Sequence, residues 1–261
     1  MNRNSKRRDA AAWRVVQLTD CHLGLAPGTL YRGADPDHSL ERIVHRLTRR
    51  PPDLLVASGD LAEAPAATVY HRLRRLLLKS GAPLLVLPGN HDHRGLLRAA
   101  FAPVAALPGD LISLGPWVIL GLDSTQPGRP DGYLAPSQLD HVDRLPAGRP
   151  ALIFVHHHPL PVQAPWIDRY PLHNGAALLT AADHQPAVRA IAFGHIHFAF
   201  IARRRHYRLY GTPATSVNSL RDEPRFTPDG RGPSWREFRL TADGRLTSRC
   251  HRLVPQPLPS P

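Results

Sequence analysis

The sequence predicts an α/β fold in one domain that covers residues 13–252 of the 261-residue chain. Short apolar runs alternate with amphipathic helical stretches as far as residue 193, which is typical of a sheet covered by helices. Beyond residue 193, four segments alternate like antiparallel strands, so we expect a second, meandering sheet to close the domain. Residues 1–12 and 253–261 are expected to be flexible termini.

Individual elements follow from periodicity and from turn residues. Six apolar runs have the length of buried strands, at 13–19, 53–58, 83–88, 117–122, 151–155 and 188–193. Apolar residues recur at helical spacing over 37–50, 67–81 and 137–145, and Gly81 is placed to end the second of these helices. The late strands are expected within 198–205, 206–214, 235–240 and 244–253.

Composition excludes several classes of protein. The net charge of +12 comes almost entirely from 31 arginines, and no basic run is interleaved with aromatic residues, so we do not expect nucleic acid binding. No apolar stretch approaches the roughly 20 residues of a membrane span, and the basic N-terminus lacks the apolar core of a signal peptide. Only two cysteines, Cys21 and Cys250, are present, so we expect reduced thiols and a cytoplasmic location.

Five short clusters of polar residues follow predicted strands. They are "TDCH" (19–22), "SGD" (58–60), "PGNHD" (88–92), "HHH" (156–158) and "GHIH" (194–197). The carboxyl ends of strands in a mostly parallel sheet share one edge, where ligand sites form. The sequence therefore predicts that these clusters converge on one site.

Spacing within the clusters supports convergence. Residues i and i+2 of an extended segment point to the same side, so Asp20 and His22 should project together while Cys21 points away. The same rule groups His195 with His197 and turns Ile196 away. Three glycines directly before the key residues allow tight turns and close backbone approach, namely Gly59, Gly89 and Gly194.

The set D-x-H, GD, GNHD, a strand-terminal histidine and GHxH resembles the calcineurin-like metallophosphoesterases over roughly residues 13–215. Within them, "HHHPLPVQAPWIDRYPLHNG", "GLDS" and "GYLAPSQLDHVDRL" are similar to the bacterial class III cyclic nucleotide phosphodiesterases, which act on 3′,5′-cyclic AMP. The resemblance implies a four-layer sandwich of two mixed β-sheets flanked by helices.

The resemblance also implies a pair of divalent metal ions, each with its own ligands. One ion would be held by Asp20, His22 and His197. Asp60 would bridge to the other ion, held by Asn90, His156 and His195. Nitrogen and oxygen ligands without thiolate suit iron, manganese, zinc or cobalt, and the family implies iron or manganese.

The expected reaction is hydrolysis of 3′,5′-cyclic AMP to 5′-AMP by a hydroxide that the metal pair activates. His91 would protonate the departing oxygen and Asp92 would orient its imidazole. Substrate contacts are expected from His22, Asp60, Asn90, His91 and His197.

Other roles stay open at this stage. His157 and His158 either brace the ligands or face the substrate, and Trp166, Asp168 and Asn174 either shape the substrate wall or form an ordinary packed loop. A broader phosphodiesterase acting on glycerophosphodiesters or 2′,3′-cyclic nucleotides is the alternative enzyme. A basic scaffold with a decayed site is the non-enzymatic alternative, although no ligand of the set is missing.

Overall fold

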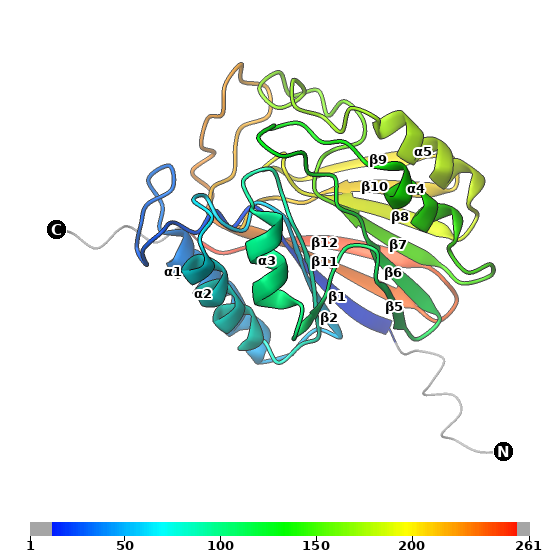
Figure 1. Cartoon of the computed structure of the whole chain (residues 1–261), viewed down its shortest axis with the longest axis horizontal. Coiled ribbons are helices and arrows are strands. Elements are labelled where there is room, and N and C mark those ends of the chain that lie inside the picture. The colour runs from blue at the N-terminus through cyan, green and yellow to red at the C-terminus, as the bar shows by residue number, and fades with distance from the viewer. Residues whose placement is uncertain (1–11, 255–261) are drawn as a thin grey trace.

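The computed structural model describes residues 12–254, and within them the chain forms two six-stranded sheets that pack face to face (Figure 1). The first sheet has the order β12-β11-β1-β2-β3-β4. Its strands are β12 (Leu246–Arg252), β11 (Ser234–Thr241), β1 (Ala12–Leu18), β2 (Leu54–Ser58), β3 (Leu84–Leu87) and β4 (Ala105–Ala106). β1 to β4 run parallel, while β11 and β12 pair antiparallel, so the sheet is mixed.

The second sheet has the order β5-β6-β7-β8-β10-β9. Its strands are β5 (Leu111–Leu114), β6 (Trp117–Gly121), β7 (Ala151–Val155), β8 (Val188–Phe193), β10 (Tyr207–Gly211) and β9 (Phe200–Arg204). β6, β7, β8 and β10 are parallel, and β5 and β9 are antiparallel strands at the two edges.

Helices cover the outer face of each sheet (Figure 1). The first sheet carries α1 (Pro36–Thr48), α2 (Ala67–Leu78) and α3 (Arg94–Phe101), and the second carries α4 (Pro136–Asp143) and α5 (Gly175–His184). A layer of apolar side chains joins the two sheets, with the Phe154 and Phe238 rings 5.9 Å apart and edge to face. The fold class expected from the resemblance, two mixed sheets flanked by helices, is confirmed.

The expectation of a separate meandering sheet after residue 193 is wrong. The β9–β10 hairpin extends the second sheet because β10 pairs in parallel with β8. The β11–β12 hairpin instead extends the first sheet, where β11 pairs with β1. Both sheets need a partner for an unpaired edge strand, and each hairpin supplies one.

Two expectations drawn from composition concern membrane spans and cysteines. No helix among residues 12–254 is long and apolar enough to cross a membrane. Both cysteines are free thiols. The predicted flexible termini fall almost wholly on residues 1–11 and 255–261, which lie outside the described part of the chain.

Candidate metal centre and active site

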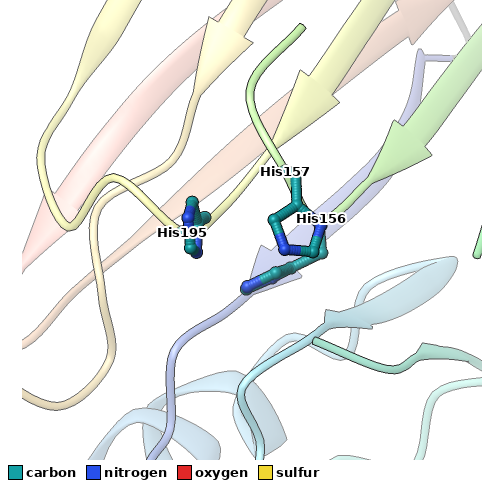
Figure 2. A group of neighbouring side chains, drawn as sticks. All are labelled: His156, His157 and His195. Atoms are coloured by element: carbon teal, nitrogen blue, oxygen red, sulfur yellow. The ribbon is translucent and has the colours of Figure 1, made fainter. Parts of the chain in front are cut away.

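The polar clusters at the strand ends converge on one place between the two sheets. Asp20, His22 and His197 have candidate ligand atoms within 4.8 Å of one another. Asp60 and His156 form a second such group with Asp20, so Asp20 and Asp60 lie close together in the same array. A third group unites His156, His157 and His195 (Figure 2). Six of the seven predicted ligands therefore lie close together, because their imidazoles and carboxylates form overlapping groups of three.

Asn90, the seventh predicted ligand, borders the same cavity as Asp60 and His195. Its side-chain oxygen Oδ1 is buried and has no hydrogen-bond partner among the described residues. The Nε2 atom of His156 is also buried and makes no hydrogen bond among the described residues, although it lies 3.3 Å from Asp60 Oδ2. Buried polar atoms without partners are costly, so these two atoms fit a site that is completed by a cation.

Hydrogen bonds on the far side of each imidazole fix which nitrogen faces the array. The Nδ1–H groups of His156 and His197 donate to the carbonyls of Ser58 (2.9 Å) and Val217 (2.7 Å). The Nε2 atom of each ring therefore faces the array, where that of His197 lies 3.3 Å from His22 Nε2. His195 is held through Nε2 by the Tyr170 carbonyl at 3.0 Å, so its Nδ1 is the free atom. Partners of this kind orient histidines that bind metals.

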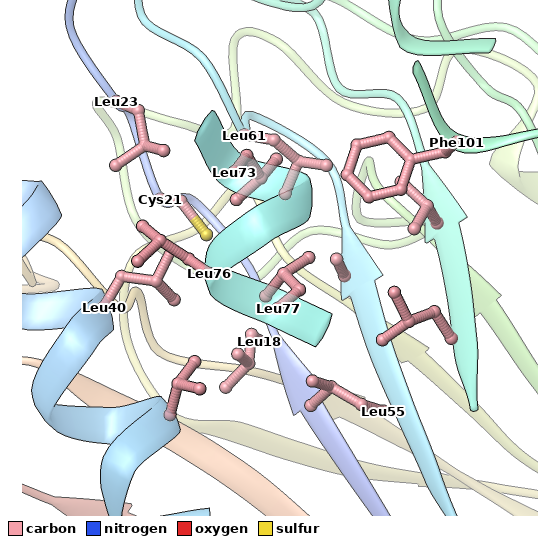
Figure 3. Close-up of a cluster of buried hydrophobic side chains, with 14 of the residues drawn as sticks. Leu18, Cys21, Leu23, Leu40, Leu55, Leu61, Leu73, Leu76, Leu77 and Phe101 are labelled. Atoms are coloured by element: carbon pink, nitrogen blue, oxygen red, sulfur yellow. The ribbon is translucent and has the colours of Figure 1, made fainter. Parts of the chain in front are cut away.

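The backbone at these residues differs from the extended conformation used to group them. Five of the seven have positive φ in the left-handed region, namely Asp20 (53°), His22 (48°), Asp60 (50°), His195 (68°) and His197 (54°). Left-handed backbone is unfavourable for residues other than glycine and is often found at functional sites. The side chains of each pair still project together, while Cys21 and Ile196 turn into the two hydrophobic cores (Figure 3 shows Cys21).

Close packing explains all three glycines. Gly59 has a φ of 96°, and a Cβ atom there would collide with the His156 ring. A Cβ atom on Gly89 would collide with the backbone nitrogen and the Oδ1 atom of Asp60. A Cβ atom on Gly194 would collide with Thr19 Oγ1 and lie 2.9 Å from Asp20 Oδ2. All three positions therefore require glycine because the candidate ligands approach the backbone there.

The three consecutive histidines are all fully buried and have different contacts. His156 Nε2 lies 3.3 Å from Asp60 Oδ2, which agrees with its expected place in the array. His157 Nδ1 lies 2.7 Å from Ser124 Oγ, and its ring contacts His195 with a centroid distance of 4.7 Å (Figure 2). His158 stacks on the other side of His195 and lies 3.4 Å from Asp168. His157 and His158 thus pack around His195, and neither borders the cavity.

The expected pairing of Asp92 with His91 is wrong. Asp92 accepts hydrogen bonds from the backbone N–H groups of Gly89, Leu61 and Ala62 and from the Tyr70 hydroxyl. Both of its oxygens are occupied by these donors, so Asp92 fixes the turn that carries Asn90 and His91.

Glu63 takes the place that the sequence had assigned to Asp92. Its Oε2 atom lies 3.2 Å from His91 Nδ1 and 2.7 Å from His22 Nδ1. Burial disfavours the charged form of His91, but the Glu63 hydrogen bond and the charge of Asp60 raise the pKa of His91 to about 9. The sequence analysis missed Glu63, although it is an acid three residues after Asp60 in "GDLAE".

The electrostatics of the array favour positive charge at its centre. Burial alone would raise the pKa of Asp60, but His156, His91 and His22 hold that pKa well below its ordinary value. Burial likewise opposes a charge on His156, yet Asp60 and Asp20 raise the pKa of His156 to about 9. Two carboxylates that outweigh the desolvation of an imidazolium would also favour bound cations.

A cavity of about 330 Å³ opens above the array. The five residues expected to contact substrate all border it, namely His22, Asp60, Asn90, His91 and His197. Trp166 borders it too, whereas Asp168 accepts from the backbone of Val162 and Ala164, and Asn174 bonds the backbone of Leu134. Of the three wall candidates, only Trp166 lies at the cavity.

Comparison with known proteins places this site in a family. Residues 14–199 match the family model described as calcineurin-like phosphoesterase. The chain belongs to the calcineurin-like phosphoesterase family. Every candidate ligand lies within the matched residues, from Asp20 to His197.

Two relatives in this family are similar over almost their whole length. One is the 3′,5′-cyclic adenosine monophosphate phosphodiesterase CpdA of Pseudomonas aeruginosa, 37% identical over 96% of this chain and 93% of that protein. Another is CpdA of Escherichia coli K12, 34% identical over 92% of this chain and 90% of that protein.

Solved structures support the same fold at low sequence identity. A dimetal phosphatase from Danio rerio matches with a TM-score of 0.64 and 13% identity, over 87% of this chain and 95% of its own. The protein TT1561 of Thermus thermophilus matches with a TM-score of 0.61 and 13% identity, over 92% of this chain and 99% of its own. These similarities show that the phosphoesterase sandwich is shared.

Proposed function

We propose that this calcineurin-like phosphoesterase hydrolyses 3′,5′-cyclic AMP to 5′-AMP. The observation that carries the proposal is the overlap of buried carboxylates and imidazoles at the floor of one cavity, with His91 held beside them by Glu63. The choice of substrate is supported by the two CpdA relatives, which are named for this activity and align over at least 90% of their length.

The array suits two divalent metal ions. Asp20, His22 and His197 would hold one ion, with Asp60 shared between the two. Asn90, His156 and His195 would complete the other, through the unpartnered atoms of Asn90 and His156 and the free Nδ1 of His195. When bound, such ions supply a hydroxide nucleophile near neutral pH and neutralise charge on the phosphoryl oxygens. The nitrogen and oxygen donors favour iron or manganese, with zinc and cobalt as alternatives.

His91 has the contacts of a general acid. Formation of 5′-AMP requires that the P–O3′ bond breaks, so a proton must reach the departing O3′ atom. Glu63 keeps His91 protonated at neutral pH, because His91 has a pKa of about 9 in this pairing. His91 would donate that proton and then recover one from solvent, since its side chain is 38% exposed.

A panel of substrates tests the proposal. The purified protein, loaded with manganese, is assayed with 3′,5′-cyclic AMP, 2′,3′-cyclic AMP, glycerophosphoethanolamine and bis(p-nitrophenyl) phosphate. We expect the highest kcat/KM on 3′,5′-cyclic AMP and 5′-AMP as the sole product. A higher kcat/KM on another diester would contradict the proposed substrate and favour the broader phosphodiesterase.

Two variants test the residues. Asp60→Ala should abolish activity on every diester and reduce bound metal, measured by plasma mass spectrometry. Asp183→Ala is the matched control, because Asp183 is a buried carboxylate paired with Arg204 at the end of α5, away from the cavity. Equal losses in the two variants would show that damage to the fold, and not loss of a ligand, explains the result.

We also propose the cytoplasm as the place of action. Cys21 is a free thiol whose pKa burial raises to about 12, which keeps it unreactive. A free thiol beside the candidate centre suits a reducing compartment.

A further inference from the structure

One wall of the active-site cavity is basic and aromatic. It is formed by Tyr31 and Arg32, by Trp166, Ile167, Arg169 and Tyr170, and by residues 224–226. Three arginines border the cavity, and among residues 12–254 Asp60 is the only acid that borders it. A phosphodiester carries one negative charge, which the ions at the floor would already neutralise. The arginines of the wall are therefore available for another part of the substrate.

Most aromatic rings of this wall are already packed. The Tyr31 ring stacks on His22 with a centroid distance of 4.1 Å and an interplanar angle of 2°. The Trp166 ring meets Phe226 edge to face at 5.1 Å and is only 9% exposed. Tyr31, Trp166 and Phe226 therefore offer little free face to a ligand, whereas Tyr170 also borders the cavity and is 36% exposed.

Arg32 is arranged differently. Its guanidinium carbon lies 3.9 Å from the centroid of the Phe226 ring and 5.4 Å from the centroid of the Tyr31 ring, so its closer aromatic contact is with Phe226. Arg32 is exposed, donates from Nε to the Tyr31 hydroxyl at 3.2 Å, and makes no ion pair within residues 12–254. A planar guanidinium that is supported by an aromatic ring and exposed to solvent can stack on another planar group.

The backbone presents Arg32 on a tight turn. Tyr31 and Ala34 exchange two backbone hydrogen bonds, and both central residues have positive φ, 48° at Arg32 and 83° at Gly33. Such turns favour Asn or Gly at the first central position, so arginine here is unfavourable for the backbone. Because Tyr31 packs on His22, the same turn fixes Arg32 relative to the candidate metal centre.

We propose that Arg32, supported by Phe226, is the nucleobase contact of this enzyme and that it stacks on the purine of the bound nucleotide. The inference rests on the proposed function because it assumes a nucleoside phosphate in the cavity. Stacking of a base on a planar side chain contributes roughly ten-fold in affinity, and larger purines gain more than pyrimidines.

Two variants at Arg32 separate stacking from charge. Arg32→Asn keeps the turn, since asparagine tolerates positive φ, and removes the planar cation. Arg32→Lys keeps the charge and removes the plane. We expect both to raise the KM for 3′,5′-cyclic AMP about ten-fold, with kcat changed less than about three-fold and the preference over cyclic CMP reduced. Arg203→Ala is the control: Arg203 is an exposed arginine on β9 that does not border the cavity, so its loss is expected to change KM by less than about three-fold.

An inhibition assay separates this inference from the proposed function. Hydrolysis of bis(p-nitrophenyl) phosphate is inhibited with 5′-AMP or with ribose 5-phosphate, which lacks the base. We expect 5′-AMP to inhibit about ten-fold more strongly, and this advantage to disappear in Arg32→Asn and Arg32→Lys. If cyclic AMP is not hydrolysed but the advantage depends on Arg32, the proposed substrate fails and the base contact stands. An absent advantage, or one that Arg32→Lys retains in full, overturns the base contact.

Discussion

Replacement of Glu63 by glutamine tests the general-acid pair most directly. The Glu63 carboxylate lies 3.2 Å from His91 Nδ1 and 2.7 Å from His22 Nδ1, and glutamine keeps its size while it removes its charge. The hydrogen bonds to His22 and His91 hold the pKa of Glu63 below its ordinary value, so it is ionised at neutral pH. Glu63→Gln therefore removes a full negative charge from the vicinity of both histidines.

The expected loss depends on pH. With Glu63 present, His91 has a pKa of about 9, so its acid form persists at neutral pH and disappears as the pH rises through that value. Without the carboxylate the pKa of His91 falls toward its ordinary 6.5, and the acid form disappears at lower pH. The protonated fraction of His91 at pH 8 then falls about 30-fold, so kcat should fall by about 30-fold near pH 8 and by less than about two-fold below about pH 6.

The assay is a pH profile of kcat on 3′,5′-cyclic AMP for wild type and Glu63→Gln, with bound metal measured in both. Glu41→Gln serves as the control, because Glu41 is an exposed acid on α1 that does not border the cavity. A parallel fall in kcat at every pH, together with loss of metal, would refute the acid role and leave Glu63 as a support for His22 alone.

Three further outcomes follow from the site. Chelation with EDTA should reduce activity more than about 100-fold and lower Tm by about 5 °C or more, because bound ions stabilise only the folded state, and added manganese should restore both. Asp92→Asn should lower the free energy of unfolding, measured with urea, by about 3 kcal/mol. The amide nitrogen of asparagine would face N–H and O–H groups that now donate hydrogen bonds to the Asp92 carboxylate. Gly89→Ala should reduce bound metal at least about ten-fold, because the new Cβ would collide with Asp60 and lie 2.8 Å from His156 Nε2; metal content measured at wild-type level would contradict this packing.

Local pattern was sufficient for the central strands of both sheets. β7 and β8 begin and end at the predicted residues: β7 is a continuous apolar run, β8 is apolar except for the exposed Arg189, and a polar cluster follows each. α3 and α5 were not predicted. α3 has 8 residues, the same length as α4, which was predicted, so length alone does not explain the miss. α5 begins "GAALLTAA", where alanine and leucine leave no polar face to reveal a helical period.

Pairing between strands that are distant in sequence could not be predicted from local pattern. Alternation identified the two late hairpins, but the partner of each hairpin lies far away in sequence. β11 pairs with β1 at the opposite end of the chain, Val15 opposite Phe238 for example, and β10 pairs with β8. Nothing in the alternation of a hairpin specifies which open sheet edge it will join.

At the candidate site too, the sequence predicted which clusters come together but not which side chains pair within them. The clusters at strand ends predicted the convergence because parallel strands share one edge. Adjacency in sequence suggested Asp92 as the partner of His91, but the Asp92 carboxylate faces the backbone N–H groups of Gly89 in its own turn and of Leu61 and Ala62 after β2. Glu63 comes from the turn after β2, and the chain path that brings it to His91 is set by the sheet.

The left-handed residues of the site are stabilised by bonds between different turns. The Asp20 and His22 N–H groups donate to the carbonyls of Gly59 and Asp60, each at 2.9 Å, which joins the turn after β1 to the turn after β2. The His195 N–H donates to the Asp20 carboxylate at 3.1 Å, which joins the turn after β8 from the other sheet. Left-handed backbone costs roughly 1–2 kcal/mol per residue, and each of these hydrogen bonds, one of them to a carboxylate, offsets part of that cost. Because the same bonds connect both sheets, the candidate ligands are held in place by the backbone itself, and ions that bind there need not order a flexible loop.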